Sequence, residues 1–127
     1  MKRFIVTGAM GAGKTSVIAE LAARGMSCIE EPARAILAEQ RAINGHALPE
    51  QSPLLFTELL LSRAIHQYQH VSGATGIHIF DRGIADVIAY AEWFGIEHAH
   101  IYNAARIYAY QPEVFFLPSW EAIYTTD

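Results

Sequence analysis

The residues best suited to chemistry lie close to the N-terminus, where the segment GAMGAGKT runs from Gly8 to Thr15. It fits the pattern GxxxxGK[ST], with a short apolar run before it and an amphipathic stretch after it. In such a loop, glycines let backbone N–H groups turn toward a phosphate, the lysine contacts the outer phosphates, and the next hydroxyl coordinates magnesium. The segment therefore predicts a site for Mg²⁺ and the phosphates of a nucleoside triphosphate, which we expect to be ATP, although the loop itself does not distinguish ATP from GTP. The residues expected to contact the nucleotide are Gly8, Gly11, Ala12, Gly13, Lys14, Thr15 and Ser16.

Other nucleotide-binding signatures do not fit the chain. From Gly8 the glycines run GxxGxG, whereas a dinucleotide-binding loop needs GxGxxG. Lys2 and Lys14 are the only lysines, so the NKxD signature that reads guanine cannot occur. Asp81 is followed by Arg82, not by the glutamate expected at this point in remodelling ATPases. These absences argue against a dinucleotide enzyme, a translational-type GTPase and a remodelling ATPase.

Asp81 and Arg82 are the next candidates, because they follow an apolar run that predicts a strand. A carboxylate at the end of such a strand can reach the metal ion of a phosphate site, although aspartate at this point could also cap the following helix. We expect Asp81 to bind Mg²⁺ together with Thr15. Arg82 could grip a phosphate with its guanidinium, or it could pair with Glu30 or Glu31, and both alternatives stay open.

Further charged residues are candidates for the site of a phosphate acceptor. Glu30 and Glu31 follow the second predicted strand, and ligands of an open α/β sheet bind beyond the carboxyl ends of its strands. One of them, Glu31 rather than Glu30, would accept a proton from a hydroxyl of the acceptor or orient that hydroxyl. The alternative is that both are solvated charges at the start of a helix. Arg34 and Arg63 lie on predicted helices and face either the cleft or the solvent. The predicted catalytic residues are Lys14, Asp81, Arg82 and Glu31, and the predicted acceptor-binding residues are Glu30, Glu31, Arg34, Arg63 and Arg82.

Hydrophobic patterning predicts alternating strands and helices around these residues. The predicted strands cover residues 4–8, 26–29, 77–80 and 113–117, and the predicted helices cover residues 14–24, 33–43, 54–70, 84–94 and 97–110. This alternation predicts an α/β fold, a three-layer sandwich with a parallel sheet and helices on both of its faces. No repeat, linker or charge run divides the chain, so residues 1–127 are expected to form a single domain.

The remaining aromatic and metal-binding side chains suggest structural roles. His66 and His70 share a helix face, but no further ligands are identifiable, so we expect no metal ion beyond the magnesium. Five aromatic residues have helical spacing and are expected to pack in the core rather than to stack on bases. They are Trp93, Phe94, Tyr102, Tyr108 and Tyr110.

The composition limits the class of protein. Of the 127 residues, 52% are hydrophobic and 17% charged, which is too apolar for a disordered chain. The formal net charge of −4 argues against nucleic acid or an anionic membrane surface as the main partner. Cys28 is the only cysteine, and no apolar run approaches the roughly 18 residues of a membrane span. A cytoplasmic location is therefore expected.

Three segments carry a resemblance to a known family: GAMGAGKTS, the EEPAR that follows the second predicted strand, and IHIFDRG at the third. With these, the chain resembles small predicted ATPases of P-loop kinase-like fold, sometimes labelled AAA-type, over nearly its whole length. More distantly, Glu31-Pro32, Arg63 and Asp81-Arg82 are similar to motifs of thymidylate and deoxynucleoside kinases. In those families the corresponding residues surround the phosphate acceptor, so the resemblance implies an acceptor site here.

Two departures from the family pattern affect these expectations. Met10 stands where relatives commonly carry proline, at a variable position of the loop. Relatives also continue past the final Thr-Asp pair into an arginine-bearing lid, a fifth strand and a last helix. The resemblance thus implies a C-terminally truncated domain, with the strand near Val114 left as an exposed apolar edge. Nucleotide binding would survive such a loss, whereas transfer of a phosphoryl group would be impaired.

Two functions follow as hypotheses. The first is an ATPase or kinase-like phosphotransferase that moves the γ-phosphoryl group of ATP to a small-molecule acceptor. The alternative is a binding module that responds to the bound nucleotide and hydrolyses it slowly. Acceptor-dependent formation of ADP distinguishes them.

Overall fold

The computed structural model describes residues 1–8, 13–71 and 76–117, and it has the predicted order of strands and helices. Most observed boundaries lie within two residues of the predicted ones. The helix predicted over residues 97–110 is the exception, since it is shorter at both ends. The strands are β1 (Lys2–Gly8), β2 (Ser27–Ile29), β3 (Ile77–Asp81) and β4 (Val114–Leu117), and the helices are α1 (Lys14–Ala23), α2 (Pro32–Ala42), α3 (Pro53–Gln69), α4 (Ile84–Trp93) and α5 (Ala99–Ile107).

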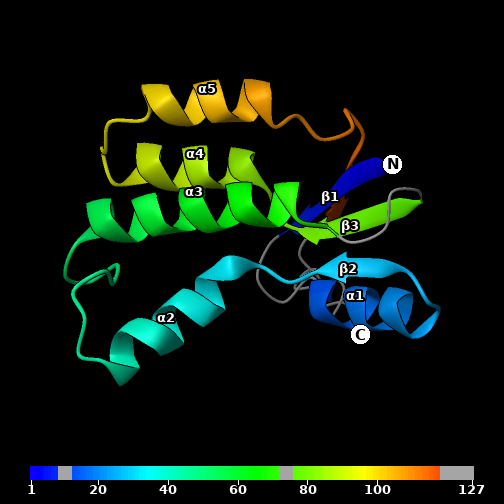
Figure 1. Ribbon diagram of the computed structural model, residues 1–127, viewed down its shortest axis with the longest axis horizontal. Helices are drawn as coiled ribbons and strands as arrows, with labels where there is room; N and C mark the ends of the chain where they lie inside the picture. Colours follow the sequence, from blue (N-terminus) through cyan, green and yellow to red (C-terminus); the bar gives the residue numbers. More distant parts are fainter. Residues whose placement is uncertain (9–12, 72–75, 118–127) are drawn as a thin grey trace, which may run out of the picture. The chain divides into compact units, whose positions relative to one another are not determined.

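The strands form one parallel sheet in the order β2-β3-β1-β4, and Figure 1 shows β2, β3 and β1 side by side. In this sheet β3 lies between β1 and β2, so the first two strands of the chain are not neighbours. The register pairs Val6 of β1 with Asp81 of β3, and Ile29 of β2 with Phe80 of β3. The predicted α/β fold with an all-parallel sheet is confirmed. The register also brings the carboxyl ends of β1, β2 and β3 to the same edge.

The chain divides into two compact units, and the sheet belongs to the first. This unit comprises Met1–Glu30, Ser72–Arg82 and Tyr110–Asp127, and it contains all four strands together with α1. Its core is formed by β-branched and aromatic side chains of the two central strands, and α1 contacts β1 and β2. Burial on both faces explains why these strands read as continuous apolar runs. The most buried core residues are Ile5, Val6, Ile79 and Phe80.

The strand β4 ends the described sheet, next to β1. Its Val114, Phe115 and Phe116 side chains are exposed, and the ring of Phe115 lies 5.8 Å from that of Phe4 on β1. The expectation of an exposed apolar strand at this edge is therefore confirmed for the described residues. Such an edge is a template for pairing with another strand.

The second unit comprises Glu31–Val71 and Gly83–Ala109 and contains the helices α2 to α5. In it α3 contacts α2 and α4, and α4 contacts α5. Figure 1 shows α3, α4 and α5 stacked side by side. Proline is the first residue of both α2 and α3, and Ser52 caps α3 by accepting a hydrogen bond from the backbone N–H of Leu55 (3.2 Å). The packed side chains are mostly aliphatic and include Ile36, Phe56, Leu60, Leu61, Ile84, Val87, Ala91, Ile101 and Ala104.

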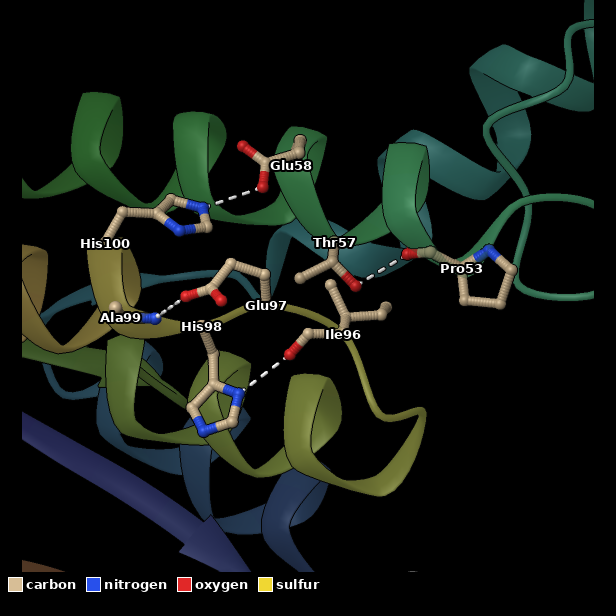
Figure 2. Close-up of polar contacts among 8 residues, drawn as sticks. All are labelled: Pro53, Thr57, Glu58, Ile96, Glu97, His98, Ala99 and His100. Atoms are coloured by element: carbon tan, nitrogen blue, oxygen red, sulfur yellow. Dashed lines mark hydrogen bonds and ion pairs between the residues drawn. The ribbon is translucent and has the colours of Figure 1, made fainter.

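Polar contacts at the α3–α5 side of this unit are drawn in Figure 2. Thr57 is fully buried, and its hydroxyl donates to the carbonyl oxygen of Pro53 one turn earlier (2.6 Å). The imidazole of His100 on α5 meets the carboxylate of Glu58 on α3 at 2.7 Å. At the start of α5, the carboxylate of Glu97 accepts from the backbone N–H of Ala99 (2.8 Å). The helix α5 thus begins at Ala99, two residues later than the sequence predicts.

The prediction that the spaced aromatic residues pack in the core is wrong for three of them. Trp93 is 84% exposed, and Phe94 and Tyr102 are also exposed. The buried positions of α4 follow the spacing Ile84, Val87 and Ala91, and Trp93 lies two residues after the last of these. Two residues correspond to about 200° around a helix, so its side chain points away from the packed face. Tyr108 and Tyr110 are half-buried.

No helix within residues 1–8, 13–71 and 76–117 is both long enough and apolar enough to cross a lipid bilayer. The predicted single domain is not tested by the division into two units and stays a prediction.

Candidate nucleotide-binding site

The predicted loop lysine and the predicted strand-end carboxylate meet in the first unit. The Nζ of Lys14, the first residue of α1, lies 2.5 Å from Oδ1 of Asp81, the last residue of β3. The two side chains are 12% and 14% exposed. They come together because β1 and β3 are neighbouring parallel strands, so the segment that leaves β1 begins beside the end of β3. Two residues that are 67 positions apart in the sequence thereby form one charged site.

The start of α1 provides backbone donors beside this pair. Gly13, which precedes the helix, has φ 82° and ψ 14°, a left-handed conformation that glycine adopts without strain. Its carbonyl oxygen accepts the first helical bond, from the N–H of Val17 (3.0 Å), and no side chain of the described residues caps the helix. Thr15 and Ser16 lie exposed in the first turn. A helix start without a side-chain cap offers N–H groups and a positive partial charge to an anion.

Gly8 at the end of β1 has a packing role that the sequence does not show. A Cβ at this position would lie 2.4 Å from the backbone oxygen of Leu117 on β4. The absence of a side chain therefore lets β4 approach the first residue of the loop. Gly11 and Ala12, also predicted to contact the nucleotide, lie outside the described residues.

Arg82 connects the end of β3 to the end of β1. Its backbone N–H donates to the carbonyl of Val6 (2.9 Å), and its Nη2 donates to the carbonyl of Gly8 (3.2 Å). The residue has φ 67°, an uncommon left-handed conformation for a side chain of this size. Arg82 thus contacts the backbone from which the loop starts.

Glu30, like Arg82, is a predicted acceptor-binding residue that belongs to the first unit. It follows β2 directly, and the pairing of Ile29 with Phe80 places the next residues, Glu30 and Asp81, along the same edge of the sheet. Its side chain is exposed. Glu30 and Asp81 thus both follow the carboxyl ends of neighbouring strands, and the role of Glu30 toward an acceptor stays a prediction.

The other predicted acceptor residues belong to the second unit. Glu31 is the residue before α2, and Arg34 lies exposed on that helix. The guanidinium of Arg63 on α3 makes two hydrogen bonds to the carboxylate of Glu39 on α2, at 2.9 and 3.2 Å. These bonds and the charge of Arg63 lower the pKa of Glu39, and the bonds also raise the pKa of Arg63. Glu39 could not be predicted as the partner of Arg63, because no spacing rule relates residues on different helices.

The residues present fit a magnesium ion of the kind bound with a nucleotide. No group of three or more His, Cys, Asp or Glu side chains capable of holding a metal occurs among the described residues. Magnesium in phosphate sites needs no such group, since one or two carboxylates and the substrate phosphates are its usual ligands. Asp81 supplies the carboxylate, and Thr15 follows Lys14 with a hydroxyl. His66 and His70 instead stack on each other, with ring centres 4.1 Å apart.

A parallel sheet in which a loop lysine meets a carboxylate from the neighbouring strand is the arrangement of P-loop nucleoside triphosphatases. The model of the AAA domain family matches residues 3–127, so the chain belongs to this family. No curated protein gives a significant match. The family and the sheet together make this chain a P-loop nucleotide-binding domain of the ATPase type. The predicted fold class and the resemblance to small AAA-type ATPases are thereby confirmed.

Proposed function

We propose that this chain binds ATP with Mg²⁺ and transfers the γ-phosphoryl group to a small-molecule acceptor. The observation that carries the proposal is the ion pair between Lys14 and Asp81 at the ends of adjacent strands. A phosphate site needs a cation for the phosphates and a carboxylate for the metal, and this pair would supply one of each. The net charge of −4 favours a small acceptor over nucleic acid, and a cytoplasmic location remains part of the proposal.

In this proposal the first unit binds the nucleotide. Lys14 and the N–H groups at the start of α1 bind phosphate oxygens, and Thr15 and Asp81 hold Mg²⁺. The metal, when bound, would neutralise charge that develops on the phosphates. Arg82 fixes the start of the loop through the Gly8 carbonyl, which keeps Lys14 and Asp81 in position.

The acceptor would be bound by the charged residues that the sequence predicts for it. An acceptor oxygen forms a bond to the γ-phosphorus, the bond from that phosphorus to the β-phosphate oxygen breaks, and ADP leaves. Glu31 or Glu30 would take the proton from an acceptor hydroxyl. Arg34, Arg63 and Arg82 would bind negative charge on the acceptor. Substitution of each of these residues tests its proposed role.

The test is acceptor-dependent formation of ADP from ATP. Purified protein is incubated with Mg-ATP and a panel of metabolites that carry hydroxyl or phosphate groups, and ADP is measured with a coupled assay. Stimulation by one compound, lost in Lys14→Ala and in Asp81→Asn, supports the phosphotransferase. Slow ADP formation that no acceptor stimulates would favour the alternative, a nucleotide-dependent binding module. Failure of Mg-ATP to raise the melting temperature of the wild type would contradict both.

A further inference from the structure

Lys14 and Asp81, the two residues with roles toward the nucleotide and the metal, are bonded to each other in this structure. The pair is short and mostly shielded from solvent, at 12% and 14% exposure. A charge-assisted hydrogen bond in such surroundings is stronger than one between exposed groups. A nucleotide that uses Lys14 must therefore first separate it from Asp81.

The cost of that separation depends on what then faces Asp81. If Lys14 turns to a phosphate and nothing replaces it, a shielded carboxylate is left without its cation and close to a polyanion. A divalent cation that arrives with the nucleotide removes this cost, because it supplies a new positive partner for the carboxylate. The pair therefore penalises the metal-free nucleotide and not the metal complex.

The formal charges of the other residues at this edge do not cancel the penalty. Among the described residues at the ends of β1, β2 and β3, the cations Lys14 and Arg82 are matched by the carboxylates Asp81 and Glu30. The edge thus has no excess of positive side-chain charge to attract a bare polyphosphate. The positive charge that favours binding has to come with the ligand.

We propose that Asp81 is a specificity-determining residue that restricts the site to metal-complexed nucleotides by holding Lys14 when no metal is present. The proposal rests on the nucleotide binding proposed above. It adds that the site disfavours nucleotides that carry no metal ion. Its distinctive consequence is that loss of the carboxylate improves binding of metal-free nucleotide, although Asp81 is itself a predicted metal ligand.

The experiment measures ADP affinity by isothermal titration calorimetry, in EDTA and in excess Mg²⁺, for wild type and Asp81→Asn. In EDTA the variant should bind ADP about tenfold more tightly than wild type, which is the effect of one charge-assisted hydrogen bond. Added Mg²⁺ should tighten binding to the wild type by at least about tenfold and to the variant by less than about threefold. The control is Glu20→Gln, which removes a carboxylate from the exposed pair with Arg24 on α1 and should change neither affinity.

A reciprocal measurement keeps the proposal testable if Asp81→Asn does not fold. Without nucleotide, Lys14→Met should bind Mn²⁺ several-fold more tightly than wild type, as measured by electron paramagnetic resonance, because the carboxylate loses its competing cation. Equal or weaker ADP binding by Asp81→Asn in EDTA would overturn the proposal, as would unchanged Mn²⁺ affinity in Lys14→Met. Failure of the wild type to bind ADP in either buffer would instead overturn the proposed function.

Discussion

Removal of the Tyr90 hydroxyl is expected to make the protein more stable. The Oη atom is buried and has no hydrogen-bond partner among the described residues. The ring packs against Phe56 and Phe94, with centres 5.5 and 4.7 Å apart, and phenylalanine would keep both contacts. A buried polar group without a partner costs about 1–3 kcal/mol. We therefore expect Tyr90→Phe to raise the free energy of unfolding by about 1 kcal/mol, which raises the melting temperature by roughly 4 °C.

The same residue makes stability depend on alkaline pH. Burial raises the pKa of Tyr90 above its ordinary value, and the negative charge of Glu50 adds to the shift. The folded protein thus holds the phenolic proton more tightly than the unfolded chain does. The free energy of unfolding of the wild type is therefore independent of this group below the pKa of unfolded tyrosine, about 10. It falls as the pH rises through the folded pKa, because the folded protein resists loss of the proton. The advantage of Tyr90→Phe over wild type should therefore widen in the alkaline range.

Urea denaturation at neutral pH and through the alkaline range measures both effects. The matched control is Tyr102→Phe, because the exposed Tyr102 hydroxyl donates to the Glu92 carboxylate at 2.8 Å. Its removal should lower stability slightly or leave it unchanged, opposite in sign to the Tyr90 variant. A loss of more than about 1 kcal/mol in Tyr90→Phe would show that the hydroxyl has a partner and refute the reasoning.

Two further substitutions test packing in the sheet. Gly8→Ala should destabilise the protein by about 2 kcal/mol even without nucleotide, because the added Cβ would meet the backbone oxygen of Leu117; unchanged denaturation would mean that β4 does not approach the loop so closely. Ser27→Ala removes the 2.8 Å hydrogen bond to Nδ1 of the buried His78 and should cost about 1–3 kcal/mol. Ser27→Thr keeps the hydroxyl, so a loss as large as that of the alanine variant would count against a role for this bond.

The sequence was sufficient to predict the strands and helices, whereas the phosphate-binding residues stay predictions. Apolar runs that end in glycine or aspartate mark strands buried on both faces, and β1 and β3 end as predicted, within a residue. The lysine and hydroxyl after Gly13 could be assigned because the loop chemistry fixes their order in the chain. Local rules apply wherever the partners of a residue are near it in sequence.

The partners that depend on strand order and helix packing could not be predicted. The close approach of Leu117 to Gly8 exists because β4 lies beside β1, and nothing in either segment specifies that neighbour. The sequence patterns predict that Lys14 binds phosphates and that Asp81 binds the metal, but they do not predict that these two side chains bind each other. Helical spacing likewise predicts Trp93 in the core, although the period of α4 turns it outward.

Arg63 and Lys14 illustrate why burial decides how readily a cation can be used by a ligand. Each is held by a carboxylate, Arg63 by Glu39 at 2.9 Å and Lys14 by Asp81 at 2.5 Å. The side chains of the first pair are 35% and 56% exposed, so water can solvate Glu39 as soon as Arg63 leaves it. An anionic acceptor could therefore recruit Arg63 without supplying a replacement cation. The side chain of Asp81 is only 14% exposed, so water solvates it less well, and a ligand that takes Lys14 is favoured when it brings a positive charge of its own.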